Sequence, residues 1–382
     1  MPGNLKSLVF FSVVIVLAAI AVWQSYIEIT SWQVQPESQS GEREQEPFFH
    51  KSFIFEQGPT DSVHASSIAS LAGDELLAVW YGGSREGASD VAIYSSRKNK
   101  DKSGWSKPEI LIDHNNVAED LGRHIKKLGN PVLLSDNNNT LWLFFVSTSI
   151  GGWSTSAINL VMSQDGGHSW GSTKRLVSSP FLNLSTLVKG RPFFYQDGSI
   201  GLPAYHELAG KFAELIRVSV GGDVTSKVRM THGRYSIQPS IVPLENDRLL
   251  AMMRNTNLTR NIVRAYAEQG GQQWSDTEYT ELNNPDAAIS VAGNAESLVL
   301  AYNDIKHDRN RLALAVSEDS GMHWKKTALL ESSEPDEHGQ KSEFSYPYII
   351  KTHDGEYHLV YTWQRKRIAY AHFNQAWLEQ QQ

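Results

Sequence analysis

The sequence predicts an all-β protein, a six-bladed β-propeller, and two observations lead to this fold. First, two turns have the form Ser-x-Asp-x-Gly-x-x-Trp, Ser163 to Trp170 and Ser317 to Trp324, and a degenerate third ends at Trp274. Second, a unit of paired apolar strands recurs along the chain, at intervals of roughly 50 residues. Short paired strands in a repeating unit are typical of propeller blades. A two-sheet sandwich or two stacked domains is the alternative, but sandwiches lack such an internal period.

The repeating units can be placed in order along the chain. Each contains apolar strands rich in β-branched and aromatic residues, separated by Asn, Asp and Gly turns. Their expected ranges are 62–113, 129–177, 189–230, 237–282, 286–331 and 344–373.

The last unit is one strand short, while residues 48–57 form a strand without a partner of its own. Pairing this N-terminal strand into the last blade would close the ring and remove an exposed edge. The sequence therefore predicts that the propeller spans residues 48–376. One short helix is expected within 116–127.

An apolar segment precedes the propeller. Residues 8–23 carry no charge and follow Lys6, which predicts export of the rest of the chain. We expect residues 1–29 to form an uncleaved signal-anchor helix, or else a cleaved signal peptide. Residues 30–47 read as a polar, solvated linker. The propeller is then expected outside the cytoplasm, anchored to the membrane, or secreted if the segment is cleaved.

Composition excludes several functions. The chain has no cysteine, which rules out disulfides, cysteine zinc sites and thiol nucleophiles. A formal charge of −7 gives no basis for nucleic-acid binding. No glycine-rich phosphate loop indicates a nucleotide cofactor. Clusters of His, Asp and Glu with metal-ligand spacing are not recognised, so neither a cofactor nor a metal is expected.

The turn motifs and the starts of the units resemble the sialidase (neuraminidase) superfamily, in particular bacterial neuraminidase-like proteins with BNR repeats, in which such turns are called Asp-boxes. The segments that carry the resemblance are HASSIASL, WYGGSREGASDVAIY, QPSIVPLENDRLLAMMR and FSYPYIIKTHDGEYHLVYTW. The resemblance covers about residues 48 to 374. It implies a sialidase-like propeller with its active site at the inner-strand ends, facing a glycan substrate.

The resemblance also implies residue roles. Sialidases bind the substrate carboxylate with three arginines, use a Tyr–Glu pair as nucleophile and an Asp as acid/base. Tyr346 matches the nucleophile, and Arg254 the second arginine. Arg309 or Arg311 is the expected third arginine. A bidentate guanidinium suits a carboxylate.

The acid/base matches Asp90, with Glu86 as the rival. Three positions depart from the family pattern. His64 replaces the first arginine, Gln238 the glutamate partner of the tyrosine, and Thr362 another glutamate.

His64, Gln238 and Tyr346 are expected at corresponding places in three units, facing one pocket. His206 and Arg191 are further candidates for that pocket.

Three functions remain open. The first is an exported exo-glycosidase that acts on a terminal acidic sugar, either a sialic or other ulosonic acid or a uronic acid. The second is a polysaccharide lyase or histidine-dependent hydrolase on uronate-containing glycans, which would use His64, His206 and Tyr346. The third is a carbohydrate-binding propeller without catalytic activity, which the three departures favour.

Overall fold

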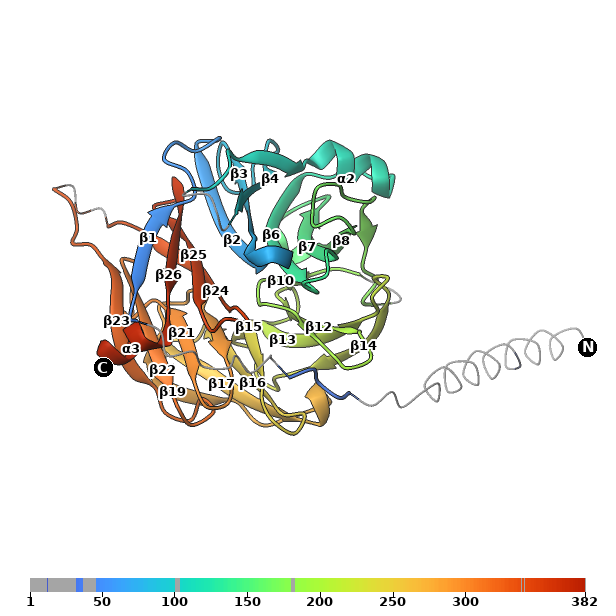
Figure 1. The fold of residues 1–382 in the computed structure, drawn as a ribbon. Helices are drawn as coiled ribbons and strands as arrows, with labels where there is room; N and C mark the ends of the chain where they lie inside the picture. Colours follow the sequence, from blue (N-terminus) through green and yellow to red (C-terminus); the bar gives the residue numbers. More distant parts are fainter. Residues whose placement is uncertain are drawn as a thin grey trace, which may run out of the picture. The chain divides into compact units, whose positions relative to one another are not determined.

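The strands of the described residues form six antiparallel sheets, shown in the computed structural model of Figure 1. The structure describes residues 32–36, 46–99, 104–179, 183–337, 339 and 341–381, together with residue 12. Residues 33–382 form one compact unit. Each sheet is one blade, and its strands follow one another in the chain except in the last blade. The predicted six-bladed all-β propeller is therefore confirmed.

The first three blades lie between residues 62 and 229. Blade 1 contains β2 (Ser62–Ser70), β3 (Leu76–Gly83), β4 (Ala92–Lys98) and β5 (Glu109–Ile112). Blade 2 contains β6 (Lys127–Ser135), β7 (Leu141–Thr148), β8 (Ala157–Ser163) and β9 (Lys174–Arg175). Blade 3 contains β10 (Thr186–Val188), β12 (Ile200–His206), β13 (Phe212–Val218) and β14 (Val224–Arg229), with the short β11 (Phe193–Phe194) paired to β12.

The last three blades complete the ring. Blade 4 contains β15 (Ser236–Pro243), β16 (Leu249–Asn255), β17 (Asn261–Glu268), β18 (Gln273–Trp274) and β19 (Glu278–Asn283). Blade 5 contains β20 (Ser290–Gly293), β21 (Leu298–Tyr302), β22 (Arg311–Ser317) and β23 (Lys325–Ser332). Blade 6 contains β24 (Phe344–Lys351), β25 (Tyr357–Trp363), β26 (Arg367–Phe373) and, from the other end of the chain, β1 (Phe49–Phe53).

The ring closes as the sequence predicts. Figure 1 shows β1, in blue, beside β26, in red, and the two strands pair antiparallel from Phe49↔Phe373 to Phe53↔Ala369. Asn374 fastens the entry to β1, because its side chain accepts from the Phe48 N–H and donates to the Glu46 carbonyl. Closure by the N-terminal strand covers the edge of β26 that would otherwise template aggregation.

Burial follows from the position of a strand within its blade. The second strands β3 and β7 are buried along their whole length, because neighbouring blades cover both faces. Their sequences are accordingly continuous apolar runs instead of alternating ones. The outer strands β1 and β23 are largely exposed or half-buried.

The Asp-box turns hold adjacent blades together. In blade 2, Asp165 accepts from the N–H and hydroxyl of Ser169 (2.9 and 2.6 Å). Gly167 has φ of +82°, and a Cβ there would lie 3.3 Å from Leu77 of blade 1. Glycine is needed in this turn for both the backbone conformation and the close approach. These turns follow the third strand of each blade, so they lie at the opposite end of the ring from the starts of the inner strands.

Three local features differ from expectation or extend it. The helix expected within 116–127 is α2 (His114–Leu121), which begins earlier and ends earlier than expected. Its ends are set by Asp113, which caps the N-terminus, and by Gly122, which ends the helix with φ of +59°. A second helix, α3 (Gln375–Gln380), follows β26, and three 3₁₀ turns are η1 (Ala72–Asp74), η2 (Trp153–Thr155) and η3 (Gln269–Gly271).

Part of the expected solvated linker is docked. Val34 is buried, forms a bridge with Tyr195 of blade 3 and donates its N–H to Asp247 at 2.8 Å. The expected signal anchor at residues 1–29 lies outside the described residues, apart from residue 12. Within the described part of the chain, no helix has the length and apolar character needed to cross a membrane.

Candidate functional site

The first strands of four blades carry a backbone bulge near their starts. The pairing register shifts after His64, Gly129, Ile237 and Ser345. The next residue in each blade has a positive φ: Ala65 (49°), Asn130 (46°), Gln238 (51°) and Tyr346 (54°). Bulges redirect side chains, and positive φ at residues other than glycine concentrates at functional sites.

This geometry corrects the expected equivalence of three polar residues. Gln238 and Tyr346 do occupy corresponding bulge positions. The corresponding residue of blade 1 is Ala65, whereas His64 is level with Ile237 and Ser345. No sequence pattern marks the bulge, so counting along the strand placed His64 one position away from the equivalent of Gln238 and Tyr346.

Tyr346 and Gln238 are nevertheless in contact. The Gln238 side-chain amide donates to the hydroxyls of Tyr346 (3.4 Å) and Tyr205 (3.2 Å), while its oxygen accepts from Arg254 (3.1 Å). Because a guanidinium only donates, the Arg254 contact fixes which way the amide points. Asn130 also donates to the Tyr205 hydroxyl at 3.3 Å. Side chains from blades 2, 3, 4 and 6 thus meet around buried Gln238.

Two of the predicted arginines reach this group. Arg254, at the end of β16, contacts Asp286 through Nε at 2.6 Å. Burial opposes the charged guanidinium, but the neighbouring Tyr346 and Asp286 raise the pKa of Arg254. The guanidinium of Arg309 lies 5.9 Å from the centre of the Tyr346 ring and bonds the Asp286 carbonyl and the Glu343 carboxylate.

A third arginine, Arg365, was missed by the sequence analysis, as was its partner Glu343. Arg365 lies in the turn between β25 and β26, and Nε contacts Glu343 at 2.7 Å. The charged contacts outweigh burial and lower the pKa of Glu343 to about 2. A signal did exist, because the start of β24 and the β25–β26 turn must lie at the same end of an antiparallel blade.

His64 is buried against the nucleophile candidate. Its ring centre lies 4.3 Å from that of Tyr346 and 5.7 Å from that of Tyr81. Burial, followed by the charge of Arg365, lowers the pKa of His64 well below its usual value, so the imidazole is neutral. Among the described residues, the His64 Nδ1 has no hydrogen-bond partner.

The loop between β3 and β4 separates the two acid/base candidates. Glu86 reaches Arg365 at 2.5 Å, and so joins the group around Tyr346. Asp90 instead closes its own loop, because it accepts from the N–H (2.9 Å) and hydroxyl (3.0 Å) of Ser84. The Ser84 N–H is the main reason why the pKa of Asp90 is lowered.

Three predicted residues lie elsewhere. Arg311 is exposed at the start of β22. His206 stacks on Phe212 and accepts from the Ala209 N–H. Arg191 lines a cavity formed by the opposite ends of β2, β6 and β24. The structure does not bring these three to Tyr346.

Lys189 holds the backbone next to Tyr346 in place. It follows β10 of blade 3, is buried, and donates to the carbonyls of Ile289 (3.2 Å) and Pro347 (2.5 Å). Burial lowers the pKa of Lys189 to about 7. Because Pro347 directly follows Tyr346, this contact fixes the bulge that carries the tyrosine.

Chemically, the group around Tyr346 combines a phenol, a neutral imidazole and three guanidinium groups. The latter come from blades 4, 5 and 6: Arg254, Arg309 and Arg365. The acidic side chains of the group are each paired with a guanidinium, Asp286 with Arg254 and both Glu86 and Glu343 with Arg365, an arrangement that does not favour a metal ion here. Guanidinium groups beside a phenol suit the carboxylate of an acidic sugar.

Comparisons with known proteins agree with the fold. The model of the BNR repeat-like domain family matches residues 74–359. The Hadza microbial sialidase Hz136 is 15% identical, with a TM-score of 0.67 over 85% of this chain and 68% of that one. The Trypanosoma rangeli sialidase is 13% identical, with a TM-score of 0.67 over 88% and 61%.

The intramolecular trans-sialidase from Ruminococcus gnavus, solved with oseltamivir carboxylate, is 12% identical, with a TM-score of 0.66 over 84% of this chain and 96% of that one. A similar structure from Dyadobacter fermentans, a protein of unknown function, is 12% identical with a TM-score of 0.68 over 85% and 97%. The comparison with curated proteins found no match. At these identities the structural likeness concerns the fold.

Proposed function

The chain belongs to the BNR repeat-like domain family, and on this basis we propose that it is a sialidase-like exo-glycosidase that removes a terminal acidic sugar from a glycan. The observation that carries the proposal is the placement of three guanidinium groups, Arg254, Arg309 and Arg365, beside Tyr346 and its neighbour His64. Such a group can bind the carboxylate of a sialic, other ulosonic or uronic acid while a phenol attacks the anomeric carbon. Export of the propeller, predicted from residues 8–23, is part of this proposal.

Tyr346 is the proposed nucleophile. As the Tyr346 oxygen bonds the anomeric carbon it gives its proton to His64, the glycosidic bond breaks, and protonated Glu86 gives its proton to the departing oxygen. Water then attacks the anomeric carbon with Glu86 as base, the bond to Tyr346 breaks, and the tyrosine oxygen takes its proton back from His64. A phenol next to a substrate carboxylate avoids the repulsion that a second carboxylate would meet. Gln238 cannot take the phenol proton, but its N–H stabilises charge that develops on the oxygen. Neutral His64, 4.3 Å from Tyr346 between ring centres, is the proposed proton acceptor.

The experiment tests the full chain on a panel of glycans that end in sialic, other ulosonic, uronic or neutral sugars, with released sugar as the readout. Arg309→Lys and Arg311→Lys form a matched pair, because Arg309 lies near Tyr346 and Arg311 is exposed outside the group. We expect release of acidic sugars only, reduced at least tenfold by Arg309→Lys and unchanged by Arg311→Lys. Release of neutral sugars at the same rate, or equal effects of the two substitutions, would contradict the proposal.

A second candidate is β-elimination on a uronate-containing glycan, favoured by the contact between neutral His64 and Tyr346. There, the imidazole would remove the proton next to the carboxylate, and the phenol would protonate the departing oxygen. The same panel distinguishes this reaction, since elimination yields an unsaturated sugar that absorbs in the ultraviolet. Binding of acidic glycans with neither product would instead identify a carbohydrate-binding propeller.

A further inference from the structure

Blade 6 carries a row of histidines at the other end of the ring from Tyr346. His358 of β25 lies directly opposite His372 of β26, which in turn lies opposite His50 of β1. Directly paired residues of an antiparallel sheet point to the same face. The rings of His358 and His372 are stacked, with centres 4.4 Å apart and planes inclined by 14°.

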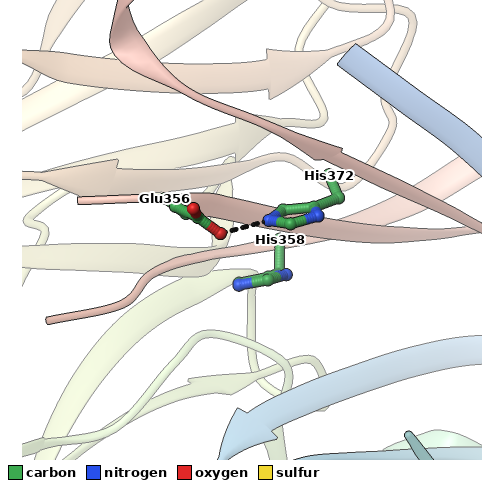
Figure 2. A group of neighbouring side chains, drawn as sticks. All are labelled: Glu356, His358 and His372. Atoms are coloured by element: carbon green, nitrogen blue, oxygen red, sulfur yellow. Dashed lines mark hydrogen bonds and ion pairs between the residues drawn. The ribbon is translucent and has the colours of Figure 1, made fainter. Parts of the chain in front are cut away.

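A carboxylate completes the group. Glu356 immediately precedes β25, and its Oε2 lies 2.5 Å from the Nε2 of His372 (Figure 2). Figure 2 shows the two imidazoles one above the other, with the carboxylate beside the edge of the upper ring. One possible ligand atom from each of Glu356, His358 and His372 lies within 4.8 Å of the others.

The surroundings suit a metal ligand set. The Nδ1 of His358 contacts the Tyr370 hydroxyl at 2.8 Å, which leaves its Nε2 for an ion. A metal-binding histidine commonly uses its second nitrogen in this way, because that contact orients the ring.

An ion would have access and a favourable field. The three residues line a cavity of about 250 Å³ between blades 6 and 1. Its other charged side chains are Asp74, Asp354 and Lys98. The carboxylates of Glu356, Asp74 and Asp354 face the one ammonium of Lys98 in this cavity, a balance that attracts a cation.

We propose that Glu356, His358 and His372 bind a divalent transition-metal ion, with Zn²⁺ as the best match. Two imidazoles and one carboxylate form a common zinc ligand set, and imidazole disfavours Ca²⁺ and Mg²⁺. Ligands at about 2.1 Å from a tetrahedral ion are about 3.4 Å apart, so His372 and Glu356 separate by roughly 1 Å on binding. The fourth position faces the cavity. This site is independent of the proposed glycosidase.

The test uses the full chain without an affinity tag, stripped with a chelator and titrated with Zn²⁺ in a calorimeter. We expect one ion per chain, confirmed by elemental analysis, and an affinity at least tenfold lower in Glu356→Gln and in His372→Gln. His323→Gln is the matched control, because it removes another contact between a histidine and a carboxylate, 2.6 Å long, to Asp319. That pair is exposed, and among the described residues it belongs to no group of three possible ligands. The affinity of this control is expected to equal that of the wild type.

A second readout guards against variants that fail to fold. Zn²⁺ should raise the Tm of the wild type, since an ion that binds only the folded chain stabilises it, whereas Ca²⁺ should not. Co²⁺ should give the visible absorption of a four- or five-coordinate ion, which Glu356→Gln removes. No bound ion in the wild type, or equal Zn²⁺ affinity in the wild type and both ligand variants, would overturn the proposal.

Discussion

Glu343 and Arg365 form a two-point ion pair, in which Nε lies 2.7 Å from one carboxylate oxygen and the second terminal nitrogen 3.3 Å from the other. The guanidinium of Arg365 also contacts Glu86 of blade 1. The backbone carbonyl of Arg365 accepts from the Val63 N–H of blade 1 at 2.9 Å. The pair thereby holds the first and last blades in register beside Tyr346. Paired guanidinium and carboxylate groups of this geometry are stronger than neutral hydrogen bonds.

The ion pair predicts a pH-dependent stability. Contacts with Arg365 and Ser345 outweigh burial and lower the pKa of Glu343 from 4.5 to about 2. A carboxyl with a depressed folded-state pKa stabilises the fold above its unfolded pKa, and this stability is lost as pH falls from 4.5 toward 2. We expect Glu343→Gln to lower the free energy of unfolding at pH 7 by about 2 kcal/mol, allowing for partial exposure.

Urea unfolding at pH 7 and pH 3 checks this prediction. The difference between wild type and Glu343→Gln should shrink by about half or more at pH 3. A difference that is the same at both pH values would show that the charge of Glu343 does not stabilise the fold.

The Asp-box of blade 5 predicts a site where alanine is not tolerated. Gly321 has φ of +87°, and a Cβ there would lie 2.5 Å from Leu250 of blade 4. Strained backbone and overpacking together should cost about 2–4 kcal/mol in Gly321→Ala. Gly104→Ala is the control, since a Cβ at Gly104 meets nothing within 4 Å. Denaturant unfolding of both variants measures the difference, and equal stability would exclude this packing role.

Much of the fold could be predicted from the sequence because a propeller repeats its local signals. The Asp-box at Ser163 contains the glycine and carboxylate that its turn requires. The unpaired strand at 48–57 could be assigned to the last unit, because that unit was one strand short. The docking of Val34 could not be foreseen, since a single apolar residue in a polar stretch carries little signal.

The site was less predictable, for physical reasons that particular residues illustrate. The bulge that separates Ala65 from His64 depends on backbone pairing, and a single positive φ leaves no mark on a residue other than glycine. Arg365 stands in a charged turn that looks like solvated surface. Glu356 and His372 are sixteen residues apart, and only strand pairing brings them together.

Ring closure predicts the effect of truncation. Removing residues 1–58 deletes β1 and exposes the edge of β26, so this variant should aggregate. Removing residues 1–45 keeps β1 and the contact of Glu46 with Asn374, so it should give a folded, soluble protein. Light scattering and circular dichroism distinguish the two, and a monomeric, folded 59–382 fragment would contradict the role of β1.

The guanidinium of Arg254 predicts a selective loss of affinity for acidic ligands when it is replaced. Arg254→Lys keeps the charge but cannot contact Gln238 and Asp286 while also pairing bidentately with a substrate carboxylate. Such pairing contributes roughly 1.5–3 kcal/mol, so binding of an acidic sugar should weaken roughly tenfold to a hundredfold. A carboxyl-reduced analogue should bind almost equally to both proteins. Calorimetry with the two ligands measures this, and equal loss for both would show that Arg254 does not recognise the carboxylate.

Removing the hydroxyl of Tyr346 distinguishes a role in catalysis from a role in binding. Tyr346→Phe keeps the ring that contacts His64 and removes the oxygen that accepts from Gln238. If this oxygen is the nucleophile, turnover should fall at least a thousandfold while the affinity for the acidic sugar changes less than threefold, because the arginines that bind the carboxylate are untouched. Released sugar and equilibrium binding are measured on the same preparation. Loss of binding in parallel with turnover would make Tyr346 a binding residue. Undiminished turnover would require a different nucleophile, and among the described residues the other phenol that contacts Gln238 is that of buried Tyr205.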